Sequence, residues 1–247
     1  NNMGIDMEKM RARRVALDNK NGNREVFWRP QDGETTIRIV PTSDGDPFKD
    51  YWFHYNVGNN PGFLSPKKNF GEDDALDSFV RKLYKEGTED SIKMAKSLSA
   101  RQRFFAPVVV RGEEDKGVRI WGFGKMAYEK LLNLVLNPEY GDITDHETGT
   151  DLVIRYGKPA GASFPQTEIT PRRRPSPLCE EEAQCAEWLD TIPDLDSLFE
   201  RKSPGEVETI LDEYLSGNVD ADSSDNVEKY NTESGDSVDK AFSELLS

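Results

Sequence analysis

Five parts of this 247-residue chain have strand character, either because apolar and polar residues alternate with a period of two or because they form a short apolar run. In the first of them Thr35, Ile37 and Ile39 share one face, and Pro41 ends the strand. The predicted strands are ETTIRIV at 34–40, DYWFHYNV at 50–57, RFFAPVVV at 103–110, VRIWGFGK at 118–125 and DLVIRYGK at 151–158. The third and fourth are joined by a charged, glycine-flanked loop, which is typical of a hairpin.

Apolar residues at intervals of three and four predict helices between and after these strands. Leu76, Phe79, Val80 and Leu83 form one such stripe, and Thr88 is positioned to cap the next helix. The predicted helices occupy residues 73–86, 88–98, 125–137, 180–192 and 203–215. The last of them begins with Ser203, Pro204 and Glu206, which supply an N-cap, a first-turn proline and the acid of a capping box.

The order of these elements predicts a mainly β, α+β protein built on an OB-fold barrel with helical insertions. Residues 217–247 are polar and too poor in apolar residues to fold, although Phe242, Leu245 and Leu246 share a helical face in the terminal AFSELLS. The predicted domains are a basic N-terminal arm at 1–24, an OB-fold core at 25–178 with a helical insertion around 72–100, C-terminal helices at 179–216 and an acidic disordered tail at 217–247.

Charge is divided unevenly along the chain, which carries −14 in total. Residues 179–247 contain 20 acidic and 4 basic residues, so the first 178 residues have a net charge of +2. Within that body, residues 81–125 hold 11 basic and 6 acidic residues. A mildly basic body joined to an acidic end predicts two surfaces with distinct roles, and the negative total does not by itself exclude a nucleic-acid partner.

Two cysteines, Cys179 and Cys185, are too few for a disulfide framework, and we expect them to be reduced thiols. No stretch approaches the roughly 18 consecutive apolar residues of a membrane span, and the N-terminus lacks the apolar segment of a secretory signal. We therefore expect an intracellular protein that does not contact a membrane.

The strand at 118–125 carries the clearest candidate for a binding surface. Residues two apart share a face, so Arg119, Trp121, Phe123 and Lys125 form a stripe of two aromatics between two cations. Single-stranded nucleic acid is bound by base stacking on aromatics and by cations along the phosphates. The alternative is that the aromatics fill the core, which would bury Arg119 without a partner at a cost of several kcal/mol. We favour the binding interpretation.

The preceding strand adds Arg103, Phe105 and Arg111 on one face if it pairs in register. Other basic segments are candidates for phosphate contacts, although each cation alone is an ordinary surface charge. These candidates are Lys67, Lys68, Arg81, Lys82, Arg155, Tyr156 and Lys158. Trp52, Phe53 and Tyr55 form a second aromatic cluster, for which core packing and binding are equally good interpretations.

Catalytic chemistry has little support in this sequence, so we expect no enzyme. Only His54 and His146 are residues of a type that can act as a base at neutral pH, and neither lies near a nucleophile motif. Glu113, Glu114 and Asp115 fall at the expected hairpin tip, where they would be solvated. A GxxxxGK[ST] phosphate-binding loop is also missing from the sequence.

The segment RFFAPVVVRGEEDKGVRIWGFGKMAYEKLLNLV resembles the strand, loop, strand, FGK and helix of the single-stranded-DNA-binding proteins of T4-like bacteriophages, the gene 32 protein family. A weaker similarity covers TTIRIVPTSDGDPF, DLVIRYGK and the acidic end with its aromatic residue and leucines. The resemblance thus follows most of the chain in order, with one moderately specific block.

The resemblance implies an OB-fold that binds single-stranded DNA with little sequence preference, an arm for cooperative self-association and a tail that recruits replication and recombination proteins. It places the stacking aromatic on Trp121, an aromatic pair on Phe104 and Phe105, and the arm on Arg11, Arg13 and Arg14. The tail would end in Phe242, Leu245 and Leu246. It also implies DNA replication, recombination and repair in the cytoplasm of an infected bacterial host.

One departure from the family concerns metal. T4-like members hold a structural zinc with one His and three Cys before the hairpin, in a closed tetrahedral site. The corresponding region here retains His54 but has no cysteine, so packing of Leu76, Phe79 and Val80 has to replace the ion. We expect no metal and no cofactor.

The main hypothesis from the sequence is sequence-nonspecific binding of single-stranded DNA, with residues from Gly217 onward folding back over the groove as a mimic of DNA. Two alternatives remain open. One is a protein-interaction adaptor with an OB-like body, and the other is an RNA-binding OB protein, because stacking alone does not distinguish the two sugars.

Overall fold

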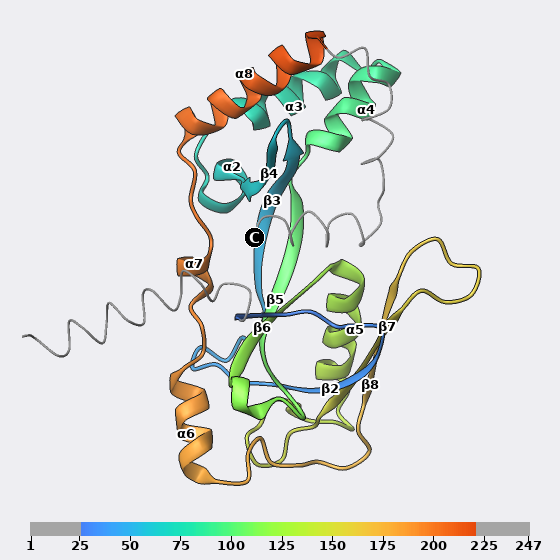
Figure 1. Cartoon of the computed structure of the whole chain (residues 1–247), viewed down its shortest axis with the longest axis vertical. Helices are drawn as coiled ribbons and strands as arrows, with labels where there is room; N and C mark the ends of the chain where they lie inside the picture. The colour runs from blue at the N-terminus through green and yellow to red at the C-terminus, as the bar shows by residue number, and fades with distance from the viewer. Residues whose placement is uncertain (1–25, 221–247) are drawn as a thin grey trace, which may run out of the picture.

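The computed structural model describes residues 26–220 (Figure 1). The predicted arm, with Arg11, Arg13 and Arg14, and the terminal Phe242, Leu245 and Leu246 therefore lie outside the described residues. The strands are β1 (Phe27–Trp28), β2 (Gly33–Ile39), β3 (Lys49–Val57), β4 (Asn60–Leu64), β5 (Arg101–Val110), β6 (Val118–Phe123), β7 (Leu152–Gly157) and β8 (Gln166–Pro171). The helices are α2 (Pro66–Phe70), α3 (Ala75–Glu86), α4 (Glu89–Leu98), α5 (Lys125–Leu136), α6 (Glu182–Asp190), α7 (Leu195–Leu198) and α8 (Pro204–Asp220), with a 3-10 turn, η1, at Glu114–Lys116.

Eight strands form one mixed sheet, so the predicted α+β class is confirmed. The pairing runs β1-β6-β5-β2-β7-β8, with β3 added to β5 and β4 added to β3. Among the strands of residues 26–220, only β1 and β6 pair in parallel. Within residues 26–220 no pairing joins β8 to β1, so the sheet is open and the predicted OB-fold barrel is not confirmed.

Strand β5 is long because it belongs to both halves of the molecule. Its first residues, Arg101 to Phe105, pair with β3, whereas Val108 to Val110 pair with β2. Strand β6 pairs with β5 along the opposite edge. Figure 1 shows β3 and β5 running from the strand lobe, which carries α5, to a helical lobe of α3, α4 and α8. The two lobes thus share a continuous pair of strands.

The helix ends follow the capping chemistry expected from the sequence. The Thr88 side chain accepts a hydrogen bond from the backbone N–H of Ser91 at 3.1 Å and begins α4. At α8, the Ser203 hydroxyl accepts from the Glu206 N–H, and the Glu206 carboxylate accepts from the Ser203 N–H at 2.8 Å. The predicted capping box is therefore confirmed.

After β8 the chain returns along one side of the whole molecule (Figure 1). Trp188 of α6 packs on Val109 and Val118 of the β5–β6 hairpin. Leu195 of α7 packs on the β3–β5 region, and Val207 of α8 joins the core of the helical lobe. The residues predicted as separate C-terminal helices are thus packed against both lobes. None of the helices within residues 26–220 is long and apolar enough to span a membrane.

Candidate nucleic-acid interface

The predicted stacking residues Trp121 and Phe123 lie in the core of the strand lobe, with 1% and 4% of their surface exposed. The ring of Trp121 lies 5.9 Å from Trp28 and 4.5 Å from Phe123 between centroids. Phe104, predicted as a binding residue, is buried in the same cluster and stacks on Tyr128 at 3.9 Å. The prediction that these aromatics form an exposed face is wrong.

The contact of Arg119 explains how Trp121 and Phe123 can lie in the core although their strand also carries a charge. Arg119 is buried with its strand, as the alternative interpretation required, but its guanidinium donates to the Glu113 carboxylate at 2.8 Å. Hydrogen bonds from Lys116 and then Arg119 hold the pKa of Glu113 below its usual value. The expected penalty for an unpaired charge is therefore avoided, and Arg119 is a structural residue rather than a phosphate contact.

The alternation predicted along β6 is correct, but its pairing with β5 is shifted by one residue. Phe104 lies opposite Phe123, and Ala106 lies opposite Trp121. Phe105 lies opposite Gly122 and therefore belongs to the other face of the sheet. The two predicted stripes do not combine into one surface, because they point to opposite sides.

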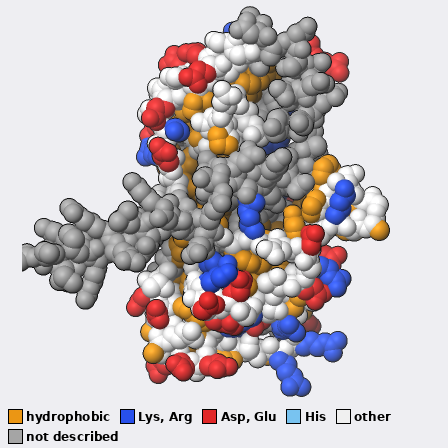
Figure 2. All heavy atoms as spheres, in the orientation of Figure 1, with side chains coloured by type: hydrophobic (Ala, Val, Ile, Leu, Met, Phe, Trp, Pro, Cys, Tyr) orange, Lys and Arg blue, Asp and Glu red, His pale blue; other side chains and the backbone are white. Residues whose placement is uncertain are grey.

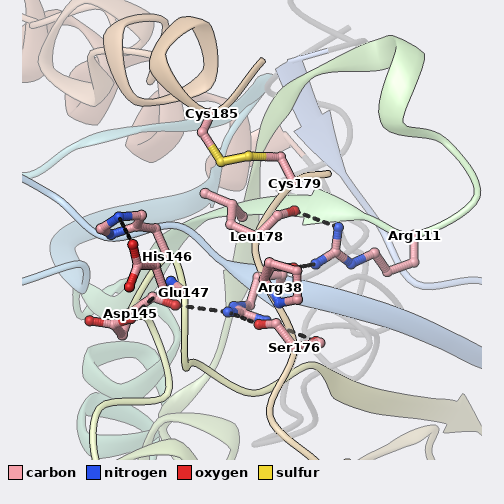
Figure 3. The surroundings of a disulfide bond; sticks show 10 residues. Arg38, Arg111, Asp145, His146, Glu147, Ser176, Leu178, Cys179 and Cys185 are labelled. Atoms are coloured by element: carbon pink, nitrogen blue, oxygen red, sulfur yellow. Dashed lines mark hydrogen bonds and ion pairs between the residues drawn. A yellow bond between two sulfur atoms is a disulfide. The ribbon is translucent and has the colours of Figure 1, made fainter. Parts of the chain in front are cut away.

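Arg111 is also taken up by structural contacts. Its guanidinium forms a two-pronged interaction with the Asp151 carboxylate, with both distances at 3.1 Å. It also donates to the carbonyl oxygens of Leu178 at 2.7 Å and Pro177 at 3.0 Å. In Figure 3, Arg111 and Arg38 reach the segment before the disulfide from the same side. Arg111 therefore fixes Pro177 and Leu178 to the body instead of presenting a charge to phosphates.

That segment leads to Cys179 and Cys185, which form a disulfide with Cα atoms 5.6 Å apart (Figure 3). The expectation of two reduced thiols is wrong for this structure. A neighbouring cleft of about 810 Å³ lies between this segment, α6 and the β5–β6 hairpin. Its rim is acidic, through Glu114, Glu180, Glu181 and Glu187, so it is a poor candidate for binding phosphates.

The remaining predicted cations are distributed over several elements. Arg81 forms an ion pair with Asp77 on α3, Lys67 with Asp73 near α2, and Arg155 of β7 with Glu34 of β2. Lys68, Lys82, Lys125 and Lys158 are exposed, and Tyr156 is half-buried. On the face shown in Figure 2, basic side chains lie among acidic ones and do not form a continuous patch.

A different surface combines the right side chains, and we name it the β3–β5 face. It consists of Lys49, Tyr51, Phe53 and Tyr55 on β3 and of Arg101, Arg103 and Phe105 on β5. Tyr51 lies directly opposite Arg103, Phe53 opposite Arg101 and Lys49 opposite Phe105. Residues opposite each other in an antiparallel pair share a face, so each cation has an aromatic across from it.

The β3–β5 face runs from one lobe to the other. Lys49, Tyr51 and Arg101 are half-buried, whereas Phe53 and Phe105 are fully buried and Tyr55 and Arg103 are 8% and 5% exposed. The Arg103 guanidinium donates to the carbonyl oxygen of Gly122 at 3.1 Å, which directs it along the sheet. An alternation of flat rings and guanidinium groups is the chemistry that stacks bases and follows a phosphate chain.

The opposite side of β3 carries a second aromatic–cation pair. The ammonium group of Lys68 lies 5.3 Å from the centroid of half-buried Trp52. Asn69 positions α2 over this strand, because its side chain accepts from the Trp52 N–H at 2.9 Å and donates to the Trp52 carbonyl at 2.7 Å. Lys68, predicted from the sequence, is thus placed over an aromatic ring.

His54 lies in the helical lobe, where its ring is 5.4 Å from Phe63 and its Nδ1 is 2.8 Å from the carbonyl oxygen of Leu98. Burial lowers the pKa of His54, so the ring is neutral and donates from Nδ1. Among residues 26–220 no group of three His, Cys, Asp or Glu side chains has the geometry to hold a metal ion.

Three residues of the β3–β5 face, Lys49, Tyr51 and Arg101, were not predicted from the sequence. The missed signal was parity, because Arg101 shares the parity of Arg103 and Phe105, and Tyr51 shares that of Phe53 and Tyr55. Comparisons with protein-family models and with curated proteins find no match for this chain, so the resemblance rests on the residues quoted above.

Proposed function

We propose that this chain is a non-enzymatic protein that binds single-stranded DNA with little sequence preference along the β3–β5 face. The observation that carries the proposal is the register that sets Tyr51 opposite Arg103 and Phe53 opposite Arg101. Half-buried Tyr51 would stack on a base and half-buried Lys49 and Arg101 would neutralise phosphates, while the buried Phe53, Phe105 and Arg103 form the floor of the face. This arrangement replaces the one expected on β6, because Tyr51 is half-buried whereas Trp121 and Phe123 are 1% and 4% exposed.

The charge division supports the same proposal. The first 178 residues are net positive although the chain carries −14. In this proposal the acidic end from Gly217 competes with DNA and recruits replication and recombination proteins, and the basic arm mediates self-association. These roles, and a place in the cytoplasm of an infected bacterial host, rest on the family resemblance.

Fluorescence anisotropy of a labelled oligo-dT with the full chain tests the proposal. We expect a dissociation constant that rises with salt, with a log–log slope of about 0.7 for each phosphate neutralised. Arg101→Ala should weaken binding and lower that slope by roughly 0.7. The matched control is Arg81→Ala, which removes an arginine of α3 that is paired with Asp77 and lies away from the β3–β5 face.

Three results would contradict the proposal. The first is no binding of oligo-dT at low salt, which would favour the protein-interaction adaptor. The second is equal affinity for duplex and single strands, because stacking requires unpaired bases. The third is a stronger preference for oligo-rU than for oligo-dT, which would indicate an RNA-binding protein that contacts the 2′-hydroxyl.

A further inference from the structure

Phe199 lies on the β3–β5 face inside a group of aromatic rings. Its centroid is 5.2 Å from Tyr51, 5.2 Å from Phe53, 5.3 Å from Phe105 and 5.9 Å from Phe27. Only 8% of its surface is exposed. Three of these four partners belong to β3 and β5, so Phe199 inserts a flat ring among the rings of the β3–β5 face and covers Tyr51, the half-buried ring assigned above to base stacking.

Phe199 reaches this position from a remote part of the sequence. It follows α7, on the segment that connects α6 at the strand lobe with α8 at the helical lobe (Figure 1). Leu195 and Leu198 pack on the same cluster of residues. We name residues 194–200 the strap, because they lie across the β3–β5 face.

The strap is also acidic. Asp194, Asp196 and Glu200 are exposed, and the Asp196 carboxylate accepts a hydrogen bond from the Tyr51 hydroxyl. A carboxylate beside an inserted ring presents the same two features as a nucleotide, an anion next to a flat group. The strap therefore matches the face in charge and in shape.

Side chains hold the strap at this place. Among residues 26–220, no backbone hydrogen bond joins the strap to β3 or β5, and the Ser197 N–H donates to the Asp194 carbonyl at 3.2 Å at the start of α7. Its two ends are fixed more firmly, through buried Trp188 of α6 and buried Val207 of α8. The strap can therefore leave the face while the helices on either side remain packed.

We infer that the strap is an internal competitor for the β3–β5 face, and that single-stranded DNA displaces Phe199 when it binds. This inference rests on the proposed function. It differs from competition by the acidic tail after Gly217, because the strap belongs to the folded body. Binding of DNA then includes a local opening of the strap, and the affinity depends on how firmly Phe199 is held.

Hydrogen exchange of the full chain with and without saturating oligo-dT tests the displacement. We expect amides in residues 194–200 to exchange faster in the complex, while amides of α8 near Leu211 keep their rate. Slower or unchanged exchange in the strap, measured where anisotropy shows saturation, would overturn the inference and leave the proposed function intact.

Variants supply a second readout. Phe199→Leu keeps an apolar side chain but loses the flat ring, and we expect it to bind oligo-dT roughly two- to tenfold more tightly, because the competing ring contacts are lost. The control is Leu211→Ala, which removes a buried side chain of the helical lobe without touching the β3–β5 face. Unchanged or weaker binding by a folded Phe199→Leu variant would contradict the inference, whereas no binding by the wild type would contradict the proposed function.

Discussion

Arg38 and Asp151 form an ion pair at 3.0 Å in which the arginine side chain is completely buried and the carboxylate is 16% exposed. The same carboxylate also binds Arg111. Arg38 uses its other nitrogen to donate to the carbonyl oxygens of Ser176 at 2.6 Å and Asp145 at 2.8 Å (Figure 3). One carboxylate thus balances two arginines that together hold the segment leading into α6.

We predict that Asp151→Asn destabilises the protein by about 3 to 5 kcal/mol, because it leaves the buried Arg38 without its counter-charge. Chemical denaturation followed by circular dichroism measures the change. The control is Glu34→Gln, which removes the partner of exposed Arg155 and should cost less than about 1 kcal/mol. Equal effects of the two substitutions would show that Asp151 does not compensate the buried charge.

The strands and helices could be predicted because their patterns are local. A period of two located β5 and β6, and capping residues located the starts of α4 and α8. The prediction of which side of the sheet faces the core was wrong, because alternation assigns residues to two faces without saying which face is covered. Here both faces are covered, with Trp121 against Trp28 and Ile120 in the cluster of Phe199. Which faces are covered depends on segments that are remote in sequence from these strands.

The role of Arg119 shows a second limit. We expected its strand to be exposed because burial would leave the arginine charge unpaired. The hairpin instead brings Glu113, six residues earlier in the chain, next to the Arg119 guanidinium. The β3–β5 face was missed for a similar reason, because it depends on the register between two strands about fifty residues apart. The register between two remote strands and the ion pair that a hairpin brings together both depend on how strands pair, which a single sequence does not display.

We predict that Trp121→Ala acts on stability and not specifically on DNA binding. Removing a buried tryptophan from the cluster of Trp28 and Phe123 should cost about 3 to 5 kcal/mol. Trp121→Phe should cost less, since it retains much of the buried area. The urea midpoint of each variant measures this, and oligo-dT affinity of the folded Trp121→Phe protein should equal that of the wild type. A stable Trp121→Ala protein with weak binding would restore the stacking role first predicted for Trp121.

The disulfide joins Cys179, which precedes α6, to Cys185 within α6, six residues later in the sequence. We predict that Cys179→Ser lowers the stability of the oxidised protein by roughly 2 kcal/mol, a value near the lower end because the loop that the bond closes is short. A thiol-reducing agent should bring the wild type to the same stability and leave the variant unchanged. Two titratable thiols in the native, unreduced protein would contradict the bond.

The last prediction concerns pH and His54. Its neutral ring donates to Leu98 in a buried site, and burial holds its pKa below the ordinary value of 6.5. The unfolded chain therefore binds a proton at a higher pH than the folded protein does. Stability from the neutral ring is present above pH 6.5 and is lost as the pH falls toward the lowered pKa, with a slope of up to about 1.4 kcal/mol per pH unit.

Denaturation between pH 7.5 and pH 5 measures that slope. His54→Asn keeps a nitrogen donor for the Leu98 carbonyl but cannot titrate, so its stability should change much less over this range. The lowered pKa values of Asp73, Glu113 and Asp145 act in a more acidic window, because those carboxylates protonate below pH 4 to 5. His146→Asn is the matched control, since His146 is exposed. The prediction would be contradicted if the slope of the wild type persisted in His54→Asn and disappeared in His146→Asn.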